Sequence, residues 1–239
     1  MKNKKSLGQH WLTDRSVLLG IAELSSGSSD TVLEIGPGLG TLTSALFRFF
    51  DRVISVEFDE NLASNLPKSF PGKNLQVEHA NILDFDTSAL PKGYSVAGNI
   101  PYYITSPIVQ KFLTCQNKPS KITLLIQKEV AERLAAGQGD YSILGLSAQI
   151  YAKVYLGPLV KKDKFTPPPK VDSQVIVLEP YAEPLATEST IALIKLGFTS
   201  PRKKLISNLS ASLRLPKSEI QAMFEQFGID LSSRPADLS

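Results

Sequence analysis

The run Asn99-Ile-Pro-Tyr102 combines residue types that can hold a flat ring carrying an exocyclic amine. The side-chain oxygen of Asn99 and the backbone carbonyl of Ile100 can accept the two amine hydrogens, which leaves the nitrogen lone pair free to react. Pro101 stiffens the turn, and Tyr102 offers a face for base stacking. Such a site works by positioning and electrostatics and needs no strong base. The alternative is an ordinary Asn-x-Pro turn before a helix.

A second pattern is the glycine-rich run Leu33-Glu-Ile-Gly-Pro-Gly-Leu-Gly40, which follows a predicted strand and precedes a predicted helix. Its glycines allow a tight turn and the close approach of a ligand. Glu57 ends the next predicted strand, where it could accept hydrogen bonds from two ribose hydroxyls. A dinucleotide site favours Gly-x-Gly-x-x-Gly, whereas the third glycine here comes one residue early. The run therefore favours S-adenosylmethionine over NAD, with Glu34 facing the amino-acid end of that cofactor. A glycine turn without a ligand is the alternative.

The adenine of such a cofactor could be held after the third predicted strand. The side-chain oxygen of Asn81 could accept a hydrogen bond from the adenine amino group, and the backbone N–H of Ile82 could donate to a ring nitrogen. Asp84 is a second candidate, and a turn-forming Asn81 without a ligand is the alternative.

The elements that must position these residues alternate along the chain. Short apolar runs rich in β-branched residues predict buried parallel strands at 31–35, 52–57, 75–79, 94–97 and 121–126. Helices are expected at 42–50, 59–66, 105–113, 128–136 and 143–151. The alternation predicts an α/β fold with a mostly parallel sheet, to which residues 154–156 and 174–178 would add an antiparallel edge hairpin.

The pattern changes after Pro180. Residues 187–196, 202–213 and 217–227 all predict helices, and no further strand is expected. We therefore expect one domain over residues 1–181, which contains the site residues above, and a small all-helical domain over residues 182–239.

Composition limits the class of protein. The chain has 239 residues, a formal net charge of +3 and 42% hydrophobic residues, which excludes a disordered or fibrous protein. One cysteine, Cys115, excludes a disulfide framework, and with only two histidines we expect no metal site. No apolar run reaches membrane-spanning length and no signal-peptide core is present, so we expect a soluble cytoplasmic protein. Nothing in the sequence requires a dimer, and we expect a monomer.

Positive charge gathers in three clusters. They are Lys2, Lys4 and Lys5; Lys161, Lys162, Lys164 and Lys170; and Arg202, Lys203 and Lys204. Together they could contact RNA phosphates and make binding strongly salt-dependent. For any one cluster, the alternative is a solvated charged face.

Several motifs, in order along nearly the whole chain, resemble those of the ribosomal RNA adenine N6,N6-dimethyltransferase family. They are residues 5–12, 34–43, 99–102, 127–133 and 165–173, and the basic stretch 198–205 followed by Asn208-Leu209. The resemblance is strongest to the bacterial small-subunit branch. It implies a Rossmann-like fold and S-adenosylmethionine-dependent dimethylation of two adjacent adenines near the 3′ end of small-subunit rRNA, within the assembling subunit. Alternatives are a large-subunit rRNA methyltransferase of the macrolide-resistance type, an assembly factor acting mainly by binding, and a small-molecule methyltransferase.

The resemblance also implies individual roles. The cofactor would be held by Gln9, His10, Leu12, Glu34, Gly36, Gly38, Leu39, Glu57, Phe58, Asn81, Ile82 and Asn99. Asn99, Ile100, Pro101 and Tyr102 would hold the target base, with Phe165 stacking on its other face. The basic clusters would contact RNA through Lys4, Lys5, Lys161, Lys162, Lys170, Arg202, Lys203 and Lys204. The resemblance makes residues 1–181 the catalytic domain and residues 182–239 the RNA-binding domain.

The chain departs from the family pattern at a few places. Asn81 stands where the family usually has Asp, so the acceptor is kept and the charge is lost. His10 and Trp11 also differ from the commonest residues at their positions. Family members usually continue into a last helix, so we expect a trimmed helical domain.

Overall fold

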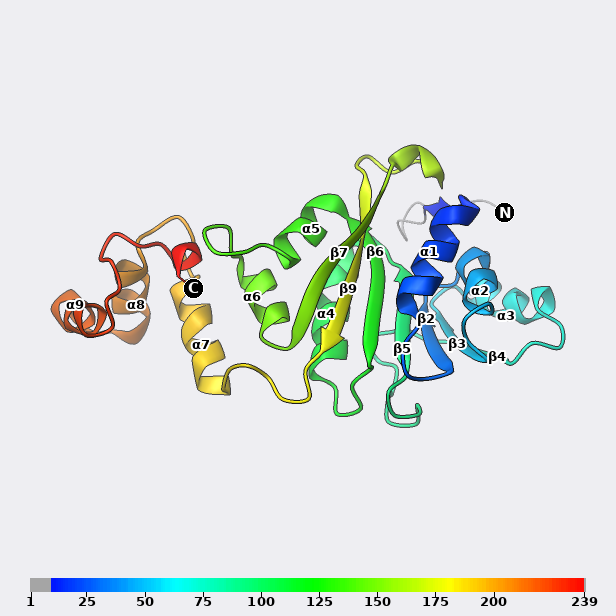
Figure 1. Ribbon diagram of the computed structural model, residues 1–239, viewed down its shortest axis with the longest axis horizontal. Helices are drawn as coiled ribbons and strands as arrows, with labels where there is room; N and C mark the ends of the chain where they lie inside the picture. Colours follow the sequence, from blue (N-terminus) through cyan, green and yellow to red (C-terminus); the bar gives the residue numbers. More distant parts are fainter. Residues whose placement is uncertain (1–9, 239) are drawn as a thin grey trace. The chain divides into compact units, whose positions relative to one another are not determined.

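The centre of the fold is a seven-stranded sheet with the strand order β4-β3-β2-β5-β6-β9-β7 (Figure 1). The computed structural model describes residues 10–238. The strands are β2 (Thr31–Ile35), β3 (Arg52–Glu57), β4 (Leu75–His79), β5 (Ser95–Asn99), β6 (Lys121–Gln127), β7 (Ala152–Val160) and β9 (Ser173–Pro180). The pairs from β4 to β6 are parallel, and β9 pairs antiparallel with both β6 and β7. The predicted mostly parallel sheet with an antiparallel edge hairpin is confirmed.

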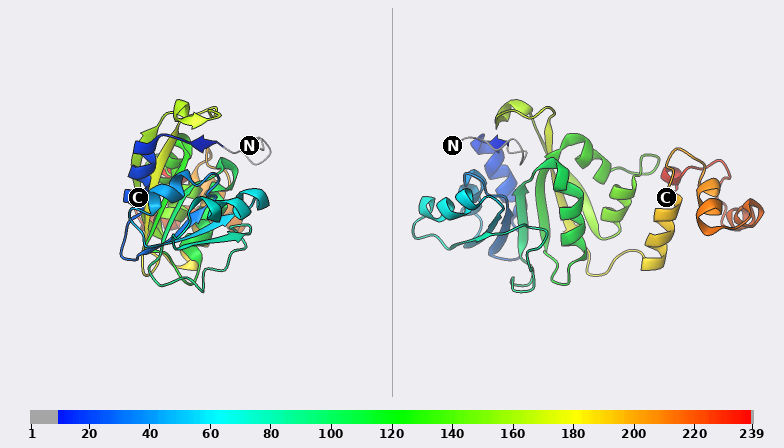
Figure 2. Two further views of the ribbon diagram at one scale, coloured as in Figure 1. Left: turned by 90° about the vertical axis from the view of Figure 1, so that its right-hand side faces the viewer. Right: turned by 180° about the vertical axis from the view of Figure 1, so that it is seen from behind.

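Helices cover both faces of this sheet. Figures 1 and 2 show α1 (Arg15–Ser25) on one face and α4 (Thr105–Thr114) on the other. All five residues of β2 are buried, as expected for a central strand covered on both faces. The remaining helices of the described chain are α2 (Thr41–Leu46), α3 (Glu60–Asn65), α5 (Lys128–Leu134), α6 (Ile143–Gln149), α7 (Glu188–Gly197), α8 (Leu205–Leu213) and α9 (Lys217–Gln226). Helix α2 ends four residues earlier than predicted. The N–H groups of Arg48 and Phe49 donate to the carbonyls three residues before them, which is the pattern of a tighter 3₁₀ turn and not of an α-helix.

Helix α1 was missed by the sequence analysis. Asp14 caps it, since its side chain accepts hydrogen bonds from the N–H groups of Ser16 and Val17. Leu18, Ile21 and Ala22 are buried. An N-cap residue followed by apolar residues at helical spacing was therefore available as a signal.

A small two-stranded sheet lies beside the main one. Strand β1 (Trp11–Leu12) pairs antiparallel with β8 (Phe165–Thr166), so Trp11 faces Thr166 and Leu12 faces Phe165. The backbone N–H of Thr13 extends this contact by donating to the Lys164 carbonyl at 3.3 Å. The start of the described chain is thereby fixed to the proline-rich segment that follows β7.

The chain divides into two compact units, which we describe separately. The first comprises residues 1–131 and 152–181, and the second residues 132–151 and 182–239. The second unit has its own core of Leu205, Ile206, Leu209, Ile220 and Phe224. The chain passes from the first to the second unit between residues 181 and 182, where the boundary was predicted.

Residues 132–151 correct that prediction, because they group with the helical unit and not with the first unit. The Gln149 side chain donates to the carbonyls of Leu134 and Ala136, both at 2.8 Å. The N–H of Leu185 donates to the Ile150 carbonyl at 2.8 Å and thus ties this segment to the chain after residue 182. Within the part of the chain described, no helix combines the length and apolarity needed to cross a membrane.

Candidate active site

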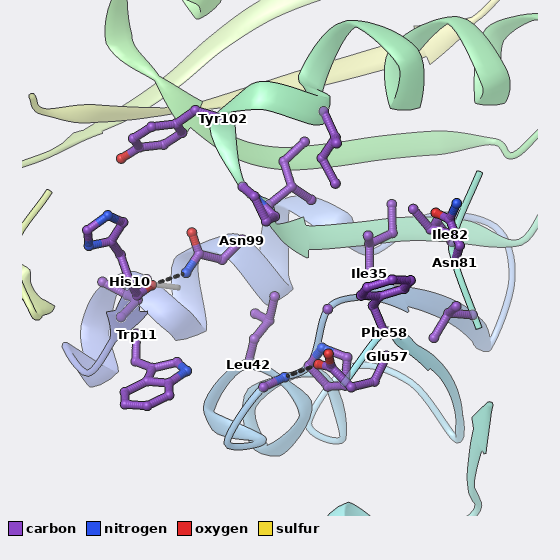
Figure 3. Close-up of a pocket in the computed structure, with 18 of the residues that line it drawn as sticks. His10, Trp11, Ile35, Leu42, Glu57, Phe58, Asn81, Ile82, Asn99 and Tyr102 are labelled. Atoms are coloured by element: carbon purple, nitrogen blue, oxygen red, sulfur yellow. Dashed lines mark hydrogen bonds between the residues drawn. The ribbon is translucent and has the colours of Figure 1, made fainter. Parts of the chain in front are cut away.

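A cavity of about 290 Å³ opens at the carboxyl ends of β2, β3 and β5 (Figure 3). The strand order places β5 on one side of β2 and β3 on the other, so the chain reverses its direction of progress across the sheet at β2. Such a switch point is where open α/β sheets bind ligands. The predicted site residues among its described lining are His10, Leu12, Gly36, Gly38, Glu57, Phe58, Asn81, Ile82, Asn99, Ile100, Pro101 and Tyr102.

One half of the cavity is formed by the glycine loop and Glu57. Gly36 and Gly38 have φ values of +62° and +56°, in the left-handed region that favours glycine. A Cβ placed on Gly36 would meet no described atom within 4 Å, so this backbone faces open space. The Gly38 N–H donates to Oε2 of Glu57 at 3.0 Å, and the Asp59 N–H donates to Oε1 at 2.9 Å. The loop and the carboxylate are therefore fixed to each other at the cavity wall.

The same half contains the turn after β4. The Asn81 side-chain oxygen accepts from the Leu83 N–H at 3.1 Å, and its amide donates to Oδ2 of Asp84 at 2.9 Å. Asn81 and Ile82 line the cavity, and Phe58, 62% exposed, lies beside them (Figure 3). The hydrogen bond to Asp84 fixes which way the Asn81 amide points.

The other half is formed by Asn99, His10 and Tyr102 (Figure 3). The Asn99 amide donates to the His10 backbone carbonyl at 3.0 Å. This hydrogen bond fixes the orientation of the Asn99 amide. Its side-chain oxygen points toward the side of Tyr102 (Figure 3), where it can accept a hydrogen bond. The Tyr102 hydroxyl and the Ser173 hydroxyl lie 2.7 Å apart, and burial raises the Tyr102 pKa.

Glu34 does not lie where it was predicted, since it is not among the described residues lining the cavity. It is fully buried, and its Oε2 accepts hydrogen bonds from the hydroxyls of Thr43 at 2.7 Å and Ser55 at 2.8 Å. Burial raises the Glu34 pKa from 4.5 to about 7, the charge of Glu57 adds to this, and the two hydroxyls oppose it. Side chains alternate along β2, so Ile35 faces the cavity and Glu34 holds α2 and β3 together behind it.

Phe165 and Leu39 also do not lie where they were predicted. Phe165 is 3% exposed and belongs to the hydrophobic core with Leu12 and Leu18, because its position in β8 turns it inward while Thr166 turns outward. Leu39 is 44% exposed. Neither is among the described residues that line the cavity.

Some predicted residues cannot be placed, because they lie outside the described part of the chain. They are Lys4 and Lys5, predicted to contact RNA, and Gln9, predicted to contact the cofactor. Lys161 pairs with Asp172 at 2.9 Å and Lys164 with Asp14 at 2.6 Å, so two charges of the second cluster are already engaged. Lys162, Lys170, Arg202, Lys203 and Lys204 are also exposed, the last three in the helical unit.

The sequence analysis missed several lining residues. They include Trp11, Ile35, Thr41, Leu42 and Tyr103. Trp11 belongs to a strand of only two residues, which is too short to show any periodicity. Ile35 and Tyr103 directly adjoin the two recognised motifs, and that adjacency was an available signal.

Comparison with known proteins places this chain in a family. The family model described as "Ribosomal RNA adenine dimethylase" matches residues 1–239. Ribosomal RNA small subunit methyltransferase A of Geobacter sulfurreducens is 37% identical, with 100% of this chain and 92% of the relative covered. The protein of that name from Dehalococcoides mccartyi strain CBDB1 is 36% identical, with 100% of this chain and 85% of the relative covered.

Solved structures agree with this. A dimethyladenosine transferase from Plasmodium falciparum has a TM-score of 0.82 at 26% identity and covers 96% of this chain and 93% of its own. The 23S rRNA methyltransferase ErmE has a TM-score of 0.78 at 29% identity and covers 96% of this chain and 94% of its own. With the full-length match, these likenesses show that the chain belongs to the ribosomal RNA adenine dimethylase family.

Proposed function

We propose that this protein is an S-adenosylmethionine-dependent methyltransferase that dimethylates N6 of two adjacent adenines near the 3′ end of small-subunit rRNA. The observation that carries the proposal is the Asn99 amide, whose nitrogen is tied to the His10 carbonyl so that its oxygen can accept from an amine beside Tyr102. The relatives at 36–37% identity, named for the small ribosomal subunit, favour that RNA as the substrate.

The first half of the cavity fits the proposed cofactor. The open face at Gly36 lets a ligand approach the backbone, and Glu57 keeps lone pairs for ribose hydroxyls beyond those used by its two backbone donors. Asn81 and Ile82 line the cavity, and in this proposal they contact the adenine. When bound, S-adenosylmethionine supplies an electrophilic methyl group.

The second half fits a target adenine. The Asn99 side-chain oxygen and the Ile100 carbonyl accept the two N6 hydrogens, which turns the nitrogen lone pair out of the ring plane. Tyr102 stacks on the base after it leaves its own strand. Positioning and hydrogen bonding carry the rate, so no side chain needs to act as a strong base.

The assembling small subunit is the proposed partner, and its RNA backbone is the proposed ligand of the exposed cationic residues. In the catalytic unit, Lys162 and Lys170 would contact RNA phosphates. In the helical unit, Arg202, Lys203 and Lys204 would do so. This substrate places the protein in the cytoplasm with the ribosomes. The monomeric state stays a prediction.

The test is methyl transfer from radiolabelled S-adenosylmethionine to purified small subunits that lack the modification, with large subunits in parallel. We expect label in dimethyladenine of the small-subunit rRNA. Label only in the large subunit would replace the proposed substrate with that of the resistance-type enzymes. Tight binding to small subunits without label in either RNA would favour an assembly factor instead.

A further inference from the structure

The turn after β4 holds Asn81 at one end of the cavity (Figure 3). The backbone of this turn is fixed at two points. The Ala80 N–H donates to the Glu57 carbonyl at 3.1 Å, which ties the start of the turn to the end of β3. The Lys111 ammonium of α4 donates to the Leu83 carbonyl at 3.0 Å, which ties the far side of the turn to the helix. The orientation of the Asn81 side chain is therefore decided by its own partners.

Two partners decide which way the Asn81 amide points. Its oxygen accepts from the Leu83 N–H at 3.1 Å, and its nitrogen donates to Oδ2 of Asp84 at 2.9 Å. Turning the amide by 180° would bring two N–H groups together at Leu83 and two oxygens together at Asp84, and both contacts would be repulsive. Because an amide oxygen can accept two hydrogen bonds, Asn81 keeps one lone pair for a ligand in the cavity.

Asp84 influences the cavity only through this amide. It is exposed and is not among the described residues that line the cavity, so it supplies no contact there itself. An ionised carboxylate only accepts hydrogen bonds, so it holds the donating end of the Asn81 amide and leaves the accepting end to the ligand. Its hydrogen bond is charge-assisted and therefore stronger than the neutral one from the Leu83 N–H.

We propose that Asp84 is the positioning residue that makes the cofactor site selective for a purine with a 6-amino group. By holding the Asn81 nitrogen, it keeps the amide oxygen available to the amine of the cofactor's adenine. A purine with a keto group at that place would meet an acceptor with an acceptor and would bind more weakly. An aspartate at position 81 would need no such partner, because both of its ends are oxygens. The inference rests on the proposed function, which supplies the cofactor.

The selectivity can be measured without methyl transfer. Calorimetry compares S-adenosylhomocysteine with S-inosylhomocysteine, which carries a keto group in place of the 6-amino group. We expect the parent to prefer the adenine compound. Asp84→Ala releases the Asn81 nitrogen, and we expect the preference to fall by roughly 2- to 10-fold, the factor that corresponds to one hydrogen bond. An unchanged preference in Asp84→Ala overturns the inference.

A second background separates orientation from support of the turn. In Asn81→Asp, nothing remains to be oriented, because either end of the side chain can accept from the amine. We therefore expect Asp84→Ala to leave the preference unchanged in the Asn81→Asp background, although it lowers the preference in the parent. An equal loss in both backgrounds would mean that Asp84 only stabilises the turn, and the inference would be wrong.

Asp86→Ala is the matched control. Asp86 is also exposed, lies two residues further along the same segment and accepts from the Ser88 N–H at 2.8 Å, but it is not among the described lining residues. It should keep the preference of the parent. A loss as large as that in Asp84→Ala would mean that the negative charge of the segment sets the preference and the bond to Asn81 does not, which also overturns the inference.

Failure of this inference and failure of the proposed function give different results. If Asp84→Ala loses the preference while the parent methylates neither ribosomal RNA, the proposed function is wrong and the role of Asp84 stands. If the parent methylates small-subunit rRNA while Asp84→Ala keeps the preference, the role of Asp84 is wrong and the proposed function stands. A parent that binds neither compound overturns both.

Discussion

The proposed role of Asn99 depends on one hydrogen bond that its neighbouring sequence does not predict. Its amide is oriented by the carbonyl of His10, 89 residues away in the sequence. The motif predicted which side chain would accept the amine, and the fold supplies the partner that decides which end of the amide faces the base. Residue type was therefore readable from the sequence, and orientation was not.

The first prediction concerns this residue. Asn99→Ala removes the acceptor for the amine, and we expect the single-turnover rate to fall by roughly 100- to 1,000-fold, as when one preorganised hydrogen-bonding group is lost from an active site. Filter binding should show nearly intact affinity for small subunits. Methylation at the parent rate would refute the role of Asn99.

The second prediction concerns Glu34, whose Oε1 is buried without a hydrogen-bond partner among the described residues. Because burial raises its pKa from 4.5 to about 7, the unfolded chain ionises Glu34 at lower pH than the folded protein does. The free energy of unfolding should therefore fall as pH rises from about 4.5 to about 7 and stay lowered above that range. Glu34→Gln should remove this loss, which amounts to at most about 3 kcal/mol.

Urea unfolding of parent and Glu34→Gln near the two ends of that pH range measures the effect. Glu23→Gln, an exposed glutamate on α1, is the control and should leave the pH dependence as in the parent. An identical pH dependence in the parent and Glu34→Gln would show that Glu34 ionises normally in the folded protein.

At the scale of elements, the glycine loop was predictable because its chemistry is local. Strand, three glycines and helix follow one another in the sequence, and their positive φ values match what glycine permits. Strands β1 and β8 were not predictable, because each has two residues and its partner lies more than 150 residues away. Phe165 was misassigned for the same reason, since only the pairing of β8 shows which way its ring turns.

The third prediction tests the loop. Gly36→Ala introduces a Cβ at φ +62° into the open side of the cavity. We expect a loss of stability of about 1 kcal/mol from the left-handed backbone, together with a clear loss of S-adenosylmethionine affinity measured by calorimetry.

Gly72→Ala is the matched control for that substitution. Gly72 has φ +74°, and a Cβ there also meets no described atom within 4 Å, but Gly72 is exposed and is not among the described residues lining the cavity. It should lose similar stability and keep full affinity. Equal affinity for the two variants would show that the cofactor does not contact Gly36.

At the scale of the whole molecule, the division into two units was predicted in outline. The composition change after Pro180 marked where the helical chain begins, whereas the grouping of residues 132–151 depends on bonds such as that from Gln149 to the Leu134 carbonyl. A glutamine at a helix end carries no sequence signal for such a bond. Local periodicity therefore predicted the helices but not the unit to which they belong.

The fourth prediction concerns the exposed cations of the helical unit. Replacing Arg202, Lys203 and Lys204 together by Ala should weaken binding to small subunits. It should also reduce the slope of log affinity against log salt concentration by about 2 to 3, if each contacts one phosphate.

The control is the triple replacement of Lys68, Lys73 and Lys92, three exposed lysines that precede β4 and β5 at the amino ends of the strands. It removes the same charge away from the cavity, and we expect a much smaller change in slope. Equal slopes for the two triple variants would mean that the effect reflects net charge and not a specific contact.

The pairing of β1 with β8 is continued by a hydrogen bond from the His10 Nδ1–H to the Pro167 carbonyl at 2.8 Å, which joins positions 157 residues apart. This separation fixes the order in which the partners are made during synthesis of the chain. The glycine loop, Glu57 and the turn at Asn81 have all emerged from the ribosome well before the proline-rich segment exists. His10 is among the first residues made, yet its hydrogen-bond partner is made only when translation reaches Pro167. The half of the cavity with Glu57 and Asn81 can therefore form during synthesis before the half with His10, whose hydrogen-bond partner is made when the first unit is almost fully translated.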